Sequence, residues 1–166
     1  RVWDNRTKLV NELHTTLTSS IARGENPTKT IDKLADKMDN SLFNAGRVVM
    51  TEGAFFASTA KQDCFADLDV DWYEYVATLD LKTSQICRDL DGKIFERKDY
   101  IVGTTAPPLH PFCRSTTAPY FADTQDAVRV ARNAEGEVYE VPANMSYHEW
   151  EQSFIELQPR EDLTIS

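Results

Sequence analysis

Three side chains that bind soft metals lie in one stretch of the sequence. His110 and Cys113 are separated by two residues, a spacing that lets both reach one ion, and Cys87 offers a second sulfur from the preceding turn. Two thiolates and an imidazole suit zinc, which prefers four ligands. The sequence predicts a zinc site of Cys87, His110 and Cys113 with Asp91 as the fourth ligand. Asp80, Asp89, Ser84 or a water molecule could take the place of Asp91.

The same residues allow two other interpretations. Cys87 and Cys113 would also serve as buried thiols or as one disulfide that ties the loop, and His110 as a hydrogen-bonded loop residue. A nucleophilic cysteine needs a nearby base, and among the three histidines His110 is the one close in sequence to a cysteine. A catalytic site would then combine His110, Cys113, Arg114, Asp80 and Glu52. The common catalytic signatures are absent from the sequence.

Several other charged residues and one thiol invite a structural interpretation. Arg47 and Glu52 interrupt an otherwise apolar helical pattern, and charges in such places usually pair. We expect Arg114 to pair with Glu52 or with an acidic residue of the turn at 80–91. Asp89 and Asp91 flank a glycine turn, where aspartate is favoured for its backbone geometry alone. Cys64 is expected to lie in the core.

Composition and charge exclude several classes of protein. The chain has 166 residues, 41% of them hydrophobic, and a formal charge of −9, so we expect a folded domain rather than a disordered chain. Residues 1–60 carry eight basic and seven acidic side chains, whereas residues 61–166 carry ten and twenty. Such an acidic part is poorly suited to phosphate backbones. The apolar runs are far shorter than the ~20 residues of a membrane span, and three cysteines favour a reducing compartment or a metal site.

Periodicity predicts helices first and strands afterwards. Apolar residues at helical spacing predict three helices: one over 1–23, one that begins at a Thr28 or Thr30 cap and ends at about 38, and one over 41–61. The third helix has apolar residues on nearly all sides, so we expect it to be central and buried. Residues 97–114 read as loop. A capping box from Ser146 to Glu149 opens a last helix. Aromatic, β-branched and alternating patterns predict strands over 72–79, 93–96 and 115–120 and a hairpin of 127–131 with 137–141.

These elements predict an α+β fold. A helical N-terminal half packs on a small, mostly antiparallel sheet, and a hairpin and a helix follow at the C-terminal end. We divide the chain into a helical region over 1–68, a β-rich region with the Cys/His motif over 69–158 and a tail over 159–166. All three belong to one compact domain. The absence of an initial methionine suggests a fragment or a processed form.

The order of motifs resembles the phage Mu protein F-like minor head proteins, also called head-morphogenesis proteins. The resemblance covers roughly residues 30–120 and rests on these motifs: Arg47 with Thr51-Glu52; Leu79-Asp80, Thr83-Ser84-Gln85-Ile86-Cys87 and Leu90-Asp91-Gly92-Lys93-Ile94-Phe95; Gly103, Pro107-Pro108-Leu109-His110-Pro111-Phe112-Cys113-Arg114-Ser115. Residues 141–150 are similar to the C-terminal end of versions from phages of Gram-positive hosts. Many members have further cysteines where this chain has Ser84 and Ser115, which removes two ligands from a zinc site.

The resemblance implies a virion component at the portal vertex that acts in head assembly, DNA packaging or genome delivery. Its partners would be the portal and other head proteins, met in the host cytoplasm during assembly. DNA is a partner that the charge does not favour, and neither a membrane nor a small-molecule substrate is implied. Members usually have a longer N-terminal region. Because family members also occur fused to toxin domains, the alternative is a nuclease or protein-modifying enzyme. It would use a cluster of His110, Cys113 and Arg114 with the Asp80–Asp91 segment.

Overall fold

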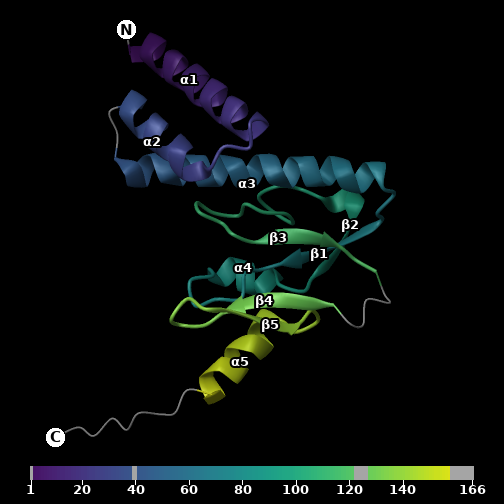
Figure 1. Ribbon diagram of the computed structural model, residues 1–166. Coiled ribbons are helices and arrows are strands. Elements are labelled where there is room, and N and C mark those ends of the chain that lie inside the picture. The colour runs from purple at the N-terminus through teal and green to yellow at the C-terminus, as the bar shows by residue number, and fades with distance from the viewer. Residues whose placement is uncertain (1, 39–40, 122–126, 158–166) are drawn as a thin grey trace, which may run out of the picture. The chain divides into compact units, whose positions relative to one another are not determined.

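The computed structural model describes residues 2–38, 41–121 and 127–157 (Figure 1). The predicted α+β class is confirmed, with helices in the N-terminal half, antiparallel sheets after them and a helix at the end of the described chain. The tail predicted from residue 159 lies outside the described residues. In chain order the elements are α1 (Val2–Ala22), α2 (Pro27–Met38), α3 (Leu42–Asp67), β1 (Trp72–Val76), α4 (Gln85–Leu90), β2 (Ile94–Glu96), the 3-10 turn η1 (Arg97–Asp99), β3 (Thr116–Pro119), β4 (Val128–Arg132), β5 (Val138–Pro142) and α5 (Tyr147–Leu157).

The chain divides into two compact units that do not follow sequence order. The first consists of residues 1–64 and 101–113, and the second of residues 65–100 and 114–166. The segment 101–113 therefore leaves the second unit after Tyr100 and returns to it at Arg114. No helix in the described part of the chain is both long and apolar enough to cross a membrane.

The first unit is built by apolar side chains at helical spacing. Leu17 from α1, Leu34 and Ala35 from α2, and Ala45 and Val49 from α3 form one buried cluster. The cap of α2 differs from both predicted residues. Its first turn is capped by Asn26, whose Oδ1 accepts a hydrogen bond of 2.9 Å from the Thr28 amide. Pro27 takes the first helical position, where its missing amide hydrogen costs nothing, so the prediction of Thr28 or Thr30 as the cap is wrong.

Helix α3 is longer and less buried than the sequence predicts. It continues to Asp67, six residues beyond the predicted end. The prediction of a helix buried on all sides is wrong, because the side chains of Leu42, Phe43, Met50 and Phe55 are exposed. Cys64 is also exposed rather than in the core. An apolar pattern indicates only that a helix can be covered, and which sides are covered depends on the elements packed there.

The second unit contains a three-stranded antiparallel sheet with the order β2-β1-β3. Tyr73 pairs with Phe95 on β2 and with Pro119 on β3, and every second residue of β1 points into the core. Tyr73 and Tyr75 are completely buried on that face. Tyr73 contacts the rings of Phe65, Phe95 and Tyr100 there.

The predicted hairpin and last helix complete the second unit. Strands β4 and β5 pair from Val128 opposite Pro142 to Arg132 opposite Val138. Leu79, Ala131, Tyr147 and Trp150 form a buried cluster that joins the hairpin to α5 and to the segment after β1. The capping box is confirmed, because Glu149 Oε2 accepts from the Ser146 amide at 2.7 Å and Ser146 Oγ accepts from the Glu149 amide at 3.3 Å.

Candidate functional site

The motif-bearing segment of the second unit starts where β1 ends and returns to the sheet at β2. It contains α4, a short helix that the sequence pattern does not predict, because its six residues are too few to show a period. Asp91 ends α4, and its amide donates to the Cys87 carbonyl at 3.1 Å. Gly92 follows with a φ of 75°, in the left-handed region where a Cβ would be strained. The Asp-Gly pair thus turns the chain from helix to strand.

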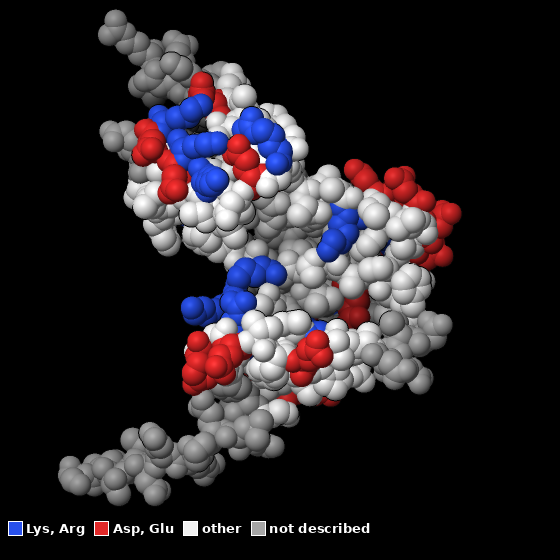
Figure 2. All heavy atoms as spheres, in the orientation of Figure 1, with Lys and Arg blue, Asp and Glu red and all other residues white. Residues whose placement is uncertain are grey.

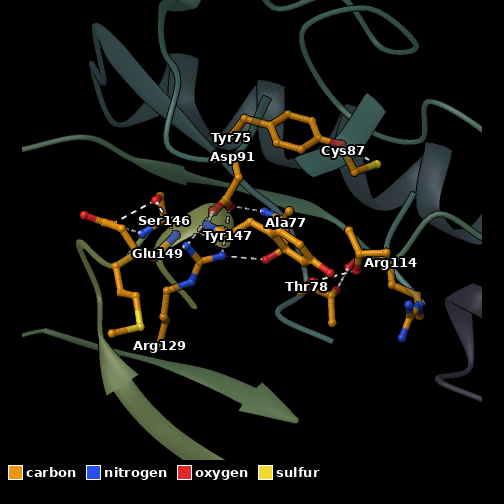
Figure 3. Close-up of polar contacts among 12 residues, drawn as sticks. Tyr75, Ala77, Thr78, Cys87, Asp91, Arg114, Arg129, Ser146, Tyr147 and Glu149 are labelled. Atoms are coloured by element: carbon orange, nitrogen blue, oxygen red, sulfur yellow. Dashed lines mark hydrogen bonds and ion pairs between the residues drawn. The ribbon is translucent and has the colours of Figure 1, made fainter. Parts of the chain in front are cut away.

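Asp91 lies at the centre of a buried network (Figure 3). Its side chain is fully buried and forms an ion pair with Arg129 of β4, which is 9% exposed. The carboxylate accepts four hydrogen bonds: from Arg129 Nη1 at 3.0 Å and Nη2 at 2.9 Å, from the Ala77 amide at 2.7 Å and from the Tyr147 amide at 2.6 Å. Arg129 also donates to the carbonyls of Met145 and Ala77. One carboxylate therefore joins the end of β1, α4, the hairpin and the start of α5.

Asp80 and Arg114 form a second ion pair in the same unit. Arg114 Nη2 donates to Asp80 Oδ1 at 2.9 Å, and the same oxygen accepts from the Lys82 amide and the Thr83 hydroxyl. Burial alone would raise the pKa of Asp80, but the hydrogen bonds and charge of Arg114 outweigh it and the pKa lies below its usual value. Arg114 therefore pairs with the 80–91 turn, which was one of its two predicted partners.

Tyr147 links this ion pair to α4 and α5. Its hydroxyl donates to the Asp80 carbonyl at 2.8 Å, and burial raises its pKa. The Arg88 guanidinium of α4 lies 4.7 Å from the centre of the Tyr147 ring and pairs with Glu151 of α5 at 2.7 Å. The polar groups around the two aspartates thus hold each other in place.

Cys87 is the buried residue of α4. Its side chain is 1% exposed, and the Tyr75 hydroxyl lies 3.2 Å from its Sγ, the geometry of a hydrogen bond donated to sulfur. Figure 3 shows both side chains, with the tyrosine ring extending towards Cys87. This contact orients the Cys87 sulfur. None of the three cysteines, all of which lie in the described part of the chain, forms a disulfide.

His110 and Cys113 lie in the segment that belongs to the first unit. The Cys113 amide donates to the His110 carbonyl at 3.2 Å, and Phe112 between them has a φ of 58°. The Phe112 amide donates to Thr51 Oγ1 of α3, and its ring lies 5.6 Å from that of Phe43. The turn that carries His110 and Cys113 is therefore fixed to α3.

The hydrogen bond of His110 determines which ring nitrogen carries the proton. Nδ1 lies 2.8 Å from the Pro111 carbonyl oxygen. A carbonyl only accepts, so Nδ1 donates, and in the neutral ring Nε2 keeps the lone pair that a metal needs. Cys87 and Cys113 are buried and His110 is half-buried, and each offers one ligand atom of a kind that zinc binds.

The remaining charged residues among the predicted site residues are exposed. Glu52 is exposed on α3 of the first unit, as is Arg47. Asp89 is exposed and accepts a hydrogen bond of 2.7 Å from Gln85. Arg129 was not among the predicted site residues. Its place two residues before Ala131 on an alternating strand was the available signal, because residues i and i+2 share a face and Ala131 is buried.

Comparison with known proteins identifies the family. The sequence profile of the family described as phage Mu protein F like protein matches residues 11–118, about two thirds of the chain, and these residues include both ion-paired aspartates, Cys87 and the His-Pro-Phe-Cys turn. No curated protein and no solved structure matches the chain. Because the match covers more than half of the chain, including α2, α3 and the motif-bearing segment, the chain belongs to the phage Mu protein F-like family and is a phage head-morphogenesis protein.

Proposed function

We propose that the protein acts at the portal vertex of the phage head, where it binds the portal and other head proteins during head assembly, DNA packaging or genome delivery. The observation that carries this proposal is the family match over residues 11–118. Proteins of a head are joined by protein contacts, so the proposal requires surfaces that suit another protein better than a nucleic acid.

The charges of the two units support protein contacts over DNA contacts. The first unit carries nine basic and eight acidic side chains, and the second carries nine basic and nineteen acidic ones. A surface with such an acidic excess repels a phosphate backbone. The first unit is almost neutral and exposes apolar side chains of α3, among them Leu42 and Phe43 at 60% and 68% exposure. Exposed apolar groups of this size favour a protein partner.

Co-assembly with the portal tests the proposal. The purified chain and the cognate portal are mixed and sedimented together, and the chain is also supplied during procapsid assembly. We expect co-sedimentation and incorporation, with weaker association for Leu42→Ser because an exposed apolar contact is lost. Val128→Ser is the matched control, since Val128 is exposed to 59% on the hairpin of the other unit. Absence of the wild-type chain from both the portal pellet and the procapsids would refute the proposal.

We also propose that Cys87, His110 and Cys113 bind one zinc ion. The support is the donor set of two buried thiols and a histidine whose Nε2 keeps its lone pair. Chain connectivity also supports the zinc site, because Cys113 directly precedes Arg114. The Arg114 side chain binds Asp80, and the Arg114 carbonyl accepts a hydrogen bond from Thr78. Asp80 and Thr78 come seven and nine residues before Cys87 in the sequence. The Asp91 oxygens already accept four hydrogen bonds, so we assign the fourth position to water.

Elemental analysis of protein from zinc-supplemented growth tests this second proposal. We expect about one zinc per chain, released by Cys87→Ser, because a lost thiolate leaves too few ligands for tight binding. Cys64→Ser is the matched control, since Cys64 is exposed on α3 and should leave the zinc content unchanged. A content below about 0.2 per chain in the folded wild type would refute the metal site without affecting the proposed role in the head.

A further inference from the structure

The second unit contains an open groove at one end of its sheet. Its volume is about 630 Å³, and it is lined by Asp69, Val70, Asp71, Trp72, Ile94, Tyr120 and Phe121. All of these residues belong to the second unit. None of them belongs to the buried network around Asp80 and Asp91. The groove is therefore a separate feature, and the proposed function does not account for it.

Hydrogen bonds to backbone carbonyls hold the walls of the groove in place. The Val70 amide donates to the Phe65 carbonyl at 2.9 Å, and Asp69, with a φ of 51°, turns the chain out of α3. The Tyr120 amide donates to the Trp72 carbonyl at 2.9 Å. Arg97 donates from its amide to the Asp71 carbonyl and from Nε to the Val70 carbonyl. A ligand would thus meet a groove that is already formed, which reduces the entropy cost of binding.

The floor of the groove is apolar and open to solvent. Trp72 and Ile94 share one face of the sheet, because Trp72 pairs with Glu96 and Ile94 pairs with Glu74. The side chains of Trp72, Ile94, Tyr120 and Phe121 are 46%, 42%, 37% and 55% exposed. Adjacent exposed aromatic groups usually mark an interaction surface, and Trp and Tyr are the residues that contribute most at such surfaces.

Two carboxylates at the groove determine the charge of a fitting ligand. Asp69 and Asp71 are exposed, and within the described parts of the chain neither carboxylate has an ion-pair partner. Figure 2 shows acidic side chains gathered at the right of the view, in the region of β2. A cationic side chain gains both from carboxylates and from the face of an indole ring. The groove therefore favours a ligand that is cationic as well as apolar.

We propose that this groove binds an extended segment of another head protein in which Lys or Arg alternates with apolar residues. The cation would lie between Asp69 and Asp71 and over the ring of Trp72, and apolar side chains would cover Ile94 and Phe121. The choice of a head protein as the source rests on the proposed function. The charge argues against the other occupants, because the acidic excess of this unit repels both nucleic acid and a second copy of itself.

Peptide binding tests the chemistry of the groove without any head protein. The probes are three short synthetic peptides of equal length, in which Arg alternates with Val, Arg with Ser, and Glu with Val. Binding to the full chain is measured by fluorescence anisotropy at about 0.15 M salt. We expect saturable binding of the Arg/Val peptide, at least about tenfold weaker binding of the Arg/Ser peptide, and none of the Glu/Val peptide. Equal affinity for the two Arg peptides would overturn the proposal and indicate attraction by net charge alone.

Variants of the chain assign the binding to this groove. Trp72→Ala should weaken the Arg/Val peptide about tenfold or more. Asp69→Asn with Asp71→Asn should weaken it by about three- to tenfold at low salt, and by less as salt rises. Val128→Ala and the pair Glu135→Gln with Glu140→Gln are matched controls at exposed positions of the hairpin. Unchanged affinity in both groove variants, with folding verified by circular dichroism, would overturn the proposal.

Association with head particles separates failure of this proposal from failure of the proposed function. If wild type and Trp72→Ala both join the portal or procapsid to the same extent, the groove proposal is wrong and the head role stands. If wild type joins neither while the Arg/Val peptide binds the groove, the head role is wrong and the ligand chemistry stands. Sedimentation of the chain alone tests whether a second copy of the chain occupies the groove. A dimer that the Trp72→Ala substitution dissociates would assign the groove to that second copy and overturn the proposal.

Discussion

The second unit buries an ion pair, whereas the ion pairs in the described part of the first unit lie at its surface. In the first unit Lys37 and Glu12 pair at the surface, with 56% and 49% of their side chains exposed, and stability comes from apolar contacts between helices. In the second unit the Arg129 and Asp91 side chains are 9% and 0% exposed. A surface pair in water contributes little, whereas a buried charge depends on its partner. Loss of one charge should therefore matter in the second unit and not in the first.

The largest effect is expected for Arg129→Met. The substitution keeps the length of the side chain and leaves the Asp91 carboxylate buried without its counter-charge, which should cost about 3–5 kcal/mol of unfolding free energy. Urea denaturation measures this loss. Arg132→Met on the same strand is the control, because Arg132 is exposed and should change stability by less than about 0.5 kcal/mol. Similar stabilities of the two variants would contradict the contrast between the units.

The second-largest loss of stability is expected in the first unit, which is stabilised by apolar contacts rather than by a buried ion pair. Leu34 is 1% exposed in the helical cluster, so Leu34→Ala should cost about 2–5 kcal/mol through lost burial and a cavity. Hydrogen exchange should show that Leu34→Ala lowers amide protection in α1 and α2 and leaves protection in the second unit unchanged. Arg129→Met should lower protection in the second unit and leave α1 and α2 protected. Leu34→Met, which conserves volume, is the control. Equal loss of protection across both units in each variant would show a single cooperative structure.

A smaller effect that depends on pH is expected for Asp80→Asn. The Asp80 side chain is 6% exposed but its partner Arg114 is 38% exposed, so we expect a loss of about 1–3 kcal/mol at neutral pH. Because the folded protein lowers the pKa of Asp80, this stability is present above the ordinary aspartate pKa of about 3.9 and is lost as pH falls through the lower folded pKa.

Urea midpoints of wild type and Asp80→Asn, compared at neutral and at acid pH, measure that dependence. The gap between the two proteins should shrink as pH falls below about 4. Asp89→Asn serves as the control, since Asp89 is exposed on α4 and should show a gap below about 0.5 kcal/mol at either pH. A gap for Asp80→Asn that stays constant with pH would mean that its charge contributes nothing.

The smallest effect is expected for the surface pair of the first unit. Lys37→Met should change the unfolding free energy by about 0–0.5 kcal/mol, because solvent screens the attraction to Glu12. A double-mutant cycle with Glu12→Gln isolates the pairwise energy from other effects of each substitution. A coupling above about 1 kcal/mol would remove the distinction between surface and buried pairs on which the comparison depends.

Much of the fold was predictable because its signals are local. The spacing of Leu13 and Leu17 indicates a helix, and the Asn133–Gly136 turn between alternating strands indicates a hairpin. The capping box at Ser146 was predicted for the same reason. Helix α4 was missed, since six residues with one buried position leave no pattern. Apolar residues around α3 predicted complete burial, but exposure of Phe43 and Met50 depends on what packs against the helix and not on the helix itself.

The sequence by itself determined the helices, most strands, the hairpin, the last helix cap and the order of motifs that identifies the family. Only the tertiary structure decided that Asp91 pairs with Arg129, 38 residues away, and that Arg114 pairs with Asp80. It also decided that Trp72, Ile94 and Phe121 line one groove. The physical reason is range. Periodicity and capping depend on residues a few positions apart, whereas a buried carboxylate takes its partner from whichever strand the folded chain brings beside it.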